Sequence, residues 1–154
     1  MTDAQIITEV TAFLGTWRTM SLATVDAQGH AHAANIQFVP DDALNLYFVS
    51  GLASAHSQHI VLDPIVAATI YAHTDEHTQI HGVQLHGRCA QVSDEAEKAK
   101  AWDLYVDRFD FIQGNAMFEK HLRSEPFFKV TPTWLRWIDN RRSFGFKMEM
   151  TLSV

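Results

Sequence analysis

The sequence predicts a mainly β fold: an antiparallel barrel of about six to seven strands, closed or split, with N-terminal and inserted helices at its periphery. Strand-like runs follow one another along the chain, and turns of hairpin length join most of them, which favours antiparallel over parallel pairing. The 154 residues, 47% of them apolar, suffice for a sizeable core, so we expect a single domain over residues 1–154.

The first expected element is an amphipathic helix over residues 3–14. We expect its apolar face to cover one end of the barrel. The side chains that recur at helical spacing and form this face are Ile6, Ile7, Val10, Phe13 and Leu14.

A β-hairpin is expected after the helix. Residues 20–25 and 31–39 are strand-like, and the turn at 26–29 ends in Gly29, where a positive φ is expected. A short turn at residues 40–42 then leads into a third antiparallel strand.

The third strand begins a segment, residues 44–72, with the order strand, turn, short helix, strand. Residues 44–50 alternate between two faces and are rich in β-prone side chains. Gly51 allows a turn, and Ser54 is suited to cap a helix, its hydroxyl accepting from an amide two or three residues on.

This helix should end by Leu62, because Pro64 lacks an amide donor and disfavours helical geometry at the residue before it. Residues 65–71 then form a buried strand. In the first helical turn, the amides of residues 55–57 lack intrahelical acceptors and lie at the positive end of the helix dipole, which favours an anion such as phosphate. The alternative is an ordinary cap with His56 as a surface histidine.

The second half of the chain is expected to contain a strand, two helices and two further strands. Gly82 and Gly87 mark bulges or bends in a long strand, and Thr131-Pro132 interrupts a later one. Acidic residues begin the longer of the two helices. The expected elements are strands at 80–92, 127–139 and 144–152 and helices at 93–109 and 115–122.

The charge pattern excludes some function classes. The net charge is −6, and the basic cluster of Arg141, Arg142 and Lys147 is too small for a nucleic-acid footprint. The N-terminus lacks the features of a signal peptide, and no apolar stretch is long enough to span a membrane. We therefore expect a cytoplasmic protein with neither a nucleic-acid nor a membrane partner.

Nine histidines raise the question of a metal site. The pairs His56 with His59 and His30 with His32 have suitable spacing, but no HExxH motif, cysteine pair or third ligand accompanies them, so we expect no metal. Cys89 is interpreted as a small buried hydrophobe, and no nucleophile elbow appears. A histidine could instead serve as an axial haem ligand, although no particular one is indicated.

A set of short motifs in shared order resembles a known family. An aromatic strand ends at Ser50, Ser54 follows four residues later, and Ala55-His56 open the helix. These motifs resemble the pyridoxamine 5'-phosphate oxidase-like, FMN-binding split-barrel superfamily, in a less characterised branch and not pyridoxamine phosphate oxidase itself. The remaining motifs are AHAANIQF (31–38), LDPIVAATIY (62–71), GVQLHGRCAQV (82–92), VTPTWLRWIDN (130–140) and RRSFGFK (141–147).

The resemblance implies FMN as cofactor and a homodimer with the flavin between subunits. It places the phosphate at the start of the 44–72 segment's helix, while Asn35 and Gln37 address the ribityl chain or ring edge. Their alternative is an outward polar sheet face, Gln84 has a similar solvent-facing alternative, and Trp137 has a core alternative. The predicted cofactor-binding residues are Asn35, Gln37, Val49, Ser50, Ser54, His56, Ser57, Gln84, Trp137 and Lys147.

Three positions depart from the family pattern. Ala55 and His56 stand where an Arg and a Lys are usual, so at most one titratable cation remains. Lys147 replaces an Arg and loses bidentate geometry. The basic residues expected to hold a pyridoxal-type phosphate are missing, which argues against that vitamin as substrate.

These observations lead to two function hypotheses. The first is an FMN-dependent oxidoreductase that acts on an unidentified small molecule, with an unidentified electron donor and no obligatory acid or base among its residues. The second is a non-enzymatic flavin- or haem-binding or sensing protein. Aromatic residues in excess of a small barrel's needs favour the homodimer: Trp102, Tyr105, Phe109, Phe111 and Trp134.

Overall fold

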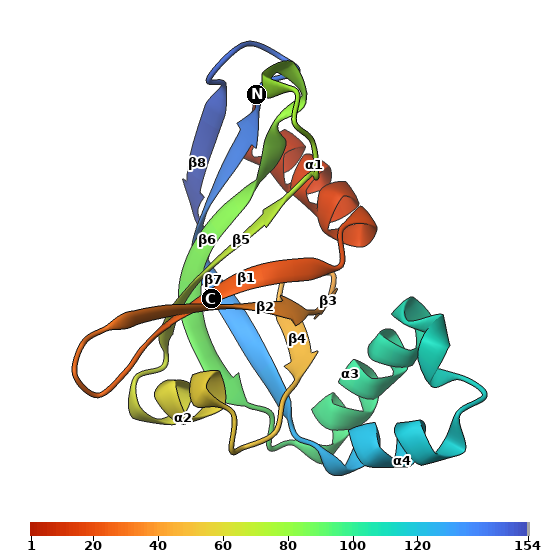
Figure 1. The fold of residues 1–154 in the computed structure, drawn as a ribbon. Coiled ribbons are helices and arrows are strands. Elements are labelled where there is room, and N and C mark those ends of the chain that lie inside the picture. The colour runs from red at the N-terminus through yellow and green to blue at the C-terminus, as the bar shows by residue number, and fades with distance from the viewer. Residues whose placement is uncertain (154) are drawn as a thin grey trace.

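The computed structural model describes residues 1–153, in which an antiparallel sheet of eight strands curls into a split barrel with helices around it (Figure 1). The split-barrel prediction is confirmed. The strands are β1 (Thr19–Val25), β2 (Ala31–Gln37), β3 (Val39–Pro40), β4 (Leu46–Val49), β5 (Ile65–Tyr71), β6 (His81–Gln91), β7 (Phe127–Asp139) and β8 (Lys147–Thr151). The helices are α1 (Asp3–Thr16), α2 (Ala55–Leu62), α3 (Glu95–Arg108) and α4 (Ala116–Ser124), with short 3-10 turns η1 (His77–Gln79) and η2 (Asp110–Ile112).

The strand order is β2-β1-β5-β6-β7-β4-β3, and β8 pairs with residues 134–138 of β7, beyond the part of β7 that pairs with β4. Every pairing is antiparallel, as predicted. The long strands β6 and β7 form the spine of the sheet, as Figure 1 shows. None of the helices within residues 1–153 is both long and apolar enough to cross a membrane.

The barrel interior is filled by alternate side chains of the strands and by one face of α1. A capping box between Thr2 and Gln5 starts α1, and its buried residues include Phe13, whose ring meets Trp137 edge-on at 5.2 Å. The expectation of an amphipathic N-terminal helix is therefore confirmed. Fully buried side chains of this core include Met20, Leu22, Leu46, Phe48, Ile70 and Phe128.

A second apolar cluster lies between α3 and the outer side of β3 and β4. Trp102 and Tyr105 of α3 are 7% and 5% exposed and pack on Phe127 and on Tyr47 of β4. The excess aromatic residues of the sequence are thus largely used inside the protomer. Trp102, Tyr105 and Phe109 are buried in the protomer, so they do not supply the dimer interface that their number led us to expect.

Most turns and helix caps of the structure follow from local signals in the sequence. The β1–β2 turn places Gly29 at φ 84°, and the Asp26 carboxylate accepts from the amides of Gln28 and His30 at 2.9 Å. Asp94 and Asn115 cap α3 and α4.

Several strand boundaries or environments differ from the prediction. The strand expected at residues 31–39 is divided into β2, which ends at Gln37, and β3, which pairs with β4. The strand expected from residue 44 begins only at Leu46, because Leu44 has φ 65° and belongs to the preceding turn. The strand over 65–71 is buried on one face only, with Ile65 51% and Tyr71 54% exposed. The last strand begins at Lys147 rather than residue 144, because a turn with Gly145 at φ 76° precedes it.

Strand β7 runs without interruption through Pro132, which is the last correction. The irregularity lies at the next residue: His86 pairs with Trp134 and Gly87 with Pro132, so Thr133 is an extra, unpaired residue of β7. A Cβ at Gly87 would lie 2.1 Å from the Thr131 carbonyl oxygen, so only glycine allows this approach. Gly82 pairs regularly but also lies close to backbone, with a Cβ position 2.5 Å from the Ile70 carbonyl oxygen.

Candidate cofactor-binding site

The predicted phosphate-binding residues of the 44–72 segment come together at the start of α2. Ser54 caps the helix: its hydroxyl accepts from the Ser57 amide at 3.4 Å and donates to the Gly51 carbonyl at 2.9 Å. The Ser50 hydroxyl lies 2.9 Å from that of Ser54 and 2.6 Å from His56 Nε2. Four predicted residues, Ser50, Ser54, His56 and Ser57, therefore form one hydrogen-bonded cluster, which we call the serine-histidine cluster.

The donors of this cluster have the chemistry that a phosphate requires. The amide of Gln58 donates to the Ser54 carbonyl at 3.1 Å, so the amides of Ala55 and His56 precede the first helical bond and are available to an anion. Ser50 and Ser54 are half-buried beside these amides. Ser57 is only 1% exposed, and its hydroxyl is hydrogen-bonded to the hydroxyls of Ser50 and Ser54. The cluster thus fits the phosphate of FMN.

His56 differs from the fixed cations that the family pattern leads one to expect. Burial of the ring, and then the nearby His59, lower the pKa of His56 below its ordinary value of 6.5. The imidazole is therefore neutral at pH 7 and acts as a hydrogen-bonding group. A carboxylate is also near, since a Cβ on Gly51 would lie 3.2 Å from Glu125 Oε2.

Asn35 and Gln84 lie on the outer face of the sheet in one cross-strand row, although three strand spacings separate them. The pairing joins Asn35 to Ser21, Ser21 to Thr69 and Thr69 to Gln84. The row continues into β7 and β8. Its members, which we call the outer row, are Asn35, Ser21, Thr69, Gln84, Arg136 and Glu149.

Gln37 and Lys147 lie two residues along the strands from the outer row, at opposite edges of the outer face. Gln37 pairs with Thr19 of β1, and Lys147 pairs with Ile138 of β7. Both side chains are exposed. The outer face therefore collects four predicted residues from three strands, β2, β6 and β8, but they do not contact one another as a compact site.

Trp137 lies on the other side of the sheet, as in the core alternative to its predicted cofactor contact. It is 1% exposed in the barrel core, and its indole Nε1 has no hydrogen-bond partner within residues 1–153. Trp134 is the tryptophan of β7 on the outer face, stacked on His86 at 4.8 Å with an interplanar angle of 11°. Val49 packs against the second apolar cluster beside α3.

Arg136 and Glu149 were not identified from the sequence, and Trp134 was named only as an aromatic residue beyond the needs of the barrel core. The signal was present: in a β-strand, alternate residues share a face, and Leu135 and Trp137 are core residues. Their neighbours Trp134 and Arg136 must then point outward. Arg136 lies over the Trp134 ring at 5.2 Å.

Three further histidines, His30, His32 and His59, form a polar cluster at the β1–β2 hairpin. Asp26 accepts from His32 at 2.8 Å and from His30 at 3.2 Å, and these bonds, with His32 first, hold the pKa of Asp26 well below its usual range. His32 contacts His59 with ring centroids 4.6 Å apart. Even so, within residues 1–153 no three His, Cys, Asp or Glu side chains are arranged to hold a metal ion.

Cys89 is buried, and burial raises the pKa of its thiol to about 12. Its thiol is therefore not a nucleophile at neutral pH.

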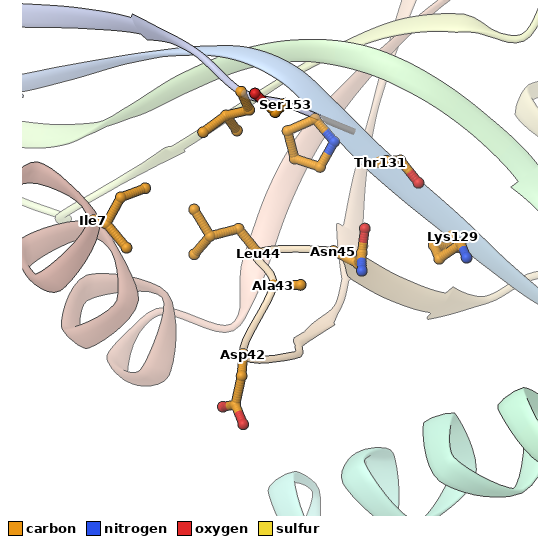
Figure 2. A pocket seen from close by; sticks show the side chains of 10 residues that line it. Ile7, Asp42, Ala43, Leu44, Asn45, Lys129, Thr131 and Ser153 are labelled. Carbon is orange, nitrogen blue, oxygen red and sulfur yellow. The ribbon is translucent and has the colours of Figure 1, made fainter. Parts of the chain in front are cut away.

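A cavity of about 510 Å³ lies elsewhere, between α1, the β3–β4 turn and β7 (Figure 2). Two of its polar residues are paired: Lys129 bonds Glu97 at 2.5 Å, and Asn45 donates to Asp41 at 2.9 Å. None of the ten predicted residues lines it. The cavity is thus separate from the candidate site.

Comparison with known proteins identifies the family. A model of the pyridoxamine 5'-phosphate oxidase family matches residues 6–139. The chain belongs to this family. The matched range includes the serine-histidine cluster and most of the outer row. No curated protein matches the sequence.

Solved structures similar to this family member share its fold at low identity. A putative pyridoxamine 5'-phosphate oxidase from Listeria innocua is 22% identical over 87% of this chain and 98% of its own, with a TM-score of 0.68. A conserved hypothetical protein from Mycobacterium tuberculosis is 18% identical over 100% and 93%, with a TM-score of 0.75. A haem-binding protein from Mycobacterium smegmatis is 15% identical over 98% and 58%, with a TM-score of 0.77.

Proposed function

We propose that this member of the pyridoxamine 5'-phosphate oxidase family binds FMN and uses it as a hydride or electron carrier on a small substrate. The observation that supports the proposal best is the serine-histidine cluster, in which hydroxyls, an imidazole and free first-turn amides gather at one helix start. Family membership supplies the expectation of a flavin; the cluster supplies donors for its phosphate.

In this proposal the phosphate is bound mainly by neutral donors. His56 lacks a permanent charge, and Ala55 has no side-chain donor, so backbone amides contribute a large share of the affinity. Asn35, Gln37, Gln84 and Lys147 provide polar groups for the ribityl chain and ring on the outer face. When bound, FMN supplies the redox chemistry, while this chain's residues bind and orient it.

We further propose that the protein acts as a homodimer through the outer face. The serine-histidine cluster and the outer row are contributed by different parts of the barrel, and the same face exposes Ile65, Tyr71 and Ala67 on its middle strand β5. A second copy placed against this face would cover these residues and enclose a flavin ring between two protomers.

Haem is the second candidate ligand, because the similar protein from Mycobacterium smegmatis is a haem-binding protein and this chain has nine histidines. In that case the protein would bind or sense its ligand without redox turnover of a substrate.

Release and identification of the bound compound tests the proposal most directly. Freshly purified protein is denatured, and the ligand is identified by absorbance and mass; apoprotein is then titrated with FMN and, separately, with haem. Stoichiometric FMN binding supports the flavoprotein. Stoichiometric haem, or no FMN binding, contradicts it.

Anaerobic reduction separates an oxidoreductase from a flavin-storing protein. The FMN complex is mixed with NADH or NADPH in the absence of oxygen, and the loss of flavin absorbance is followed. Reduction by either donor supports the oxidoreductase. A complex that neither donor reduces favours the non-enzymatic binding protein.

A further inference from the structure

A short relay of side chains on the outer face holds Gln84 in one orientation. Arg136 donates from Nη1 to Gln84 Oε1 at 3.1 Å and from Nε and Nη2 to Glu149 Oε1 at 2.8 and 2.7 Å. The three residues are direct neighbours across β6, β7 and β8. Arg136 also lies over the Trp134 ring at 5.2 Å, so its guanidinium is held on three sides.

The chemistry of a guanidinium determines which end of the amide faces it. All polar hydrogens of Arg136 are donors, so the side chain of Gln84 must present its carbonyl oxygen to Arg136. The amide nitrogen of Gln84 then lies at the free end, and within residues 1–153 it donates to no other group. Without Arg136, the amide could turn and offer either its oxygen or its nitrogen to a ligand.

At the other end of the outer row, the side-chain amide of Asn35 is oriented in the same way, with its oxygen paired. Asn35 accepts at Oδ1 from the Ser21 hydroxyl at 2.8 Å, which leaves the Asn35 amide nitrogen as its free end. The row thus offers amide N–H donors to an incoming molecule on two strands. Acceptor atoms of a ligand, such as carbonyl oxygens or ring nitrogens, can pair with these two amide nitrogens.

We propose that Arg136 and Glu149 are positioning residues that fix Gln84 as a hydrogen-bond donor to the acceptor atoms of the ligand ring on the outer face. This inference rests on the proposed FMN function, since the isoalloxazine ring is the acceptor-bearing group expected there. Arg136 acts through Gln84. Glu149 acts through Arg136, because it holds the guanidinium in the orientation that allows the hydrogen bond to Gln84.

The test is a double-mutant cycle on FMN affinity, measured by quenching of flavin fluorescence. Loss of one neutral hydrogen bond corresponds to about three- to tenfold weaker binding. We expect this loss for Gln84→Met, which has no donor, and for Gln84→Glu, which keeps the acceptor for Arg136 but loses the donor. Arg136→Met should show a loss of the same order.

The decisive comparison is the double variant Gln84→Met/Arg136→Met. If Arg136 acts through Gln84, the double variant binds FMN no more weakly than Gln84→Met alone. Additive losses would show that Arg136 contacts the ligand itself or acts by charge, and would overturn the inference. Arg136→Lys, which keeps the charge without the planar fork, should bind like Arg136→Met.

A matched control comes from another exposed arginine–glutamate pair. Arg123 donates to Glu119 at 3.1 Å on α4, outside the outer row. Arg123→Met should leave FMN affinity unchanged. The position of the flavin absorption band, which responds to hydrogen bonds at the ring, gives a second measurement in every variant. A band that is unchanged in Gln84→Met and Arg136→Met would also overturn the inference.

The two proposals fail differently. Wild-type protein that does not bind FMN contradicts the proposed function and, with it, this assignment. Wild-type protein that binds FMN while Arg136→Met binds equally well contradicts the assignment alone.

Discussion

At the scale of single residues, His56 is the position where this chain departs most from its family's pattern. The imidazole is held 2.6 Å from the Ser50 hydroxyl and is neutral at pH 7, because burial and His59 lower its pKa. A neutral donor contributes less to phosphate binding than a fixed cation does. The backbone amides of the first turn must therefore contribute more.

A pair of variants tests this division of the binding energy. His56→Ala should weaken FMN binding about threefold, the effect of one neutral hydrogen bond. Ala55→Pro removes a first-turn amide at the helix position where proline is well tolerated, and should weaken binding about tenfold. Titration of apoprotein measures both. Unchanged affinity in both variants would contradict the phosphate position.

The lowered pKa of His56 also predicts a pH effect on stability without ligand. In the unfolded chain, His56 has its ordinary pKa of 6.5 and binds a proton when the pH falls below that value. In the folded chain, His56 takes up this proton only at lower pH. Because the unfolded state then holds more protons, the free energy of unfolding falls as the pH drops below about 6.5. Urea unfolding at pH 7.5 and 5.5 should therefore show a smaller decrease for His56→Gln than for wild type. An equal decrease in both proteins would contradict the lowered pKa.

At the scale of elements, the β6–β7 pair determines how the outer face is assembled. The register shift between His86 and Gly87 lets Pro132 lie within β7 without ending it. Beyond the shift, Gln84 and Arg136 are paired neighbours, and both Leu135 and Trp137 face the core. The close approach at Gly87 thus positions half of the outer row.

Two glycine substitutions test this role. Gly87→Ala should destabilise the protein by about 2–4 kcal/mol, since its Cβ would overlap the backbone of Thr131 at 2.1 Å. Gly15→Ala in α1 is the control, because nothing lies within 4 Å of its Cβ position. That change should stabilise by about 0.5–1 kcal/mol through helix propensity. Thermal unfolding measures both, and a neutral Gly87→Ala would contradict the close approach.

Much of the secondary structure could be predicted from the sequence. Helix caps and turns depend on residues a few positions apart, so α1, α2 and the turn at Gly29 were predicted from local signals and are confirmed. The predicted start of β4 was wrong, because Leu44 adopts a positive φ that a pattern of β-prone side chains does not reveal. Its turn is held by Asp41, whose carboxylate accepts from the amides of Ala43 and Asn45.

At the scale of the whole molecule, the exposed outer face is the surface on which the proposals meet. It contains the outer row, Trp134 stacked on His86, and the exposed side chains of β5. Trp102, Tyr105 and Phe109 are buried within the protomer and cannot form this interface.

The homodimer proposal predicts a specific effect at Ala67, an exposed residue of the middle strand β5. Ala67→Glu would place a carboxylate on each copy in the covered face, so the dimer should dissociate and FMN affinity should fall at least about tenfold. Light scattering after size-exclusion chromatography measures the mass. Ala4→Glu on α1 should change neither property. A dimeric Ala67→Glu protein with wild-type affinity would contradict an interface on this face.

Local patterns along the chain predict the fold class, most helices and turns, and the serine-histidine cluster, because these depend on spacing within short stretches. Which predicted residues share a surface depends instead on how the strands pair. Asn35 and Gln84 meet in one row only through pairing of β2, β1, β5 and β6, and Trp137 faces the core because of the register that follows the Gly87 irregularity. Strand pairing joins residues far apart in the chain, and a shift of one residue moves a side chain to the other face, so local pattern could not assign them.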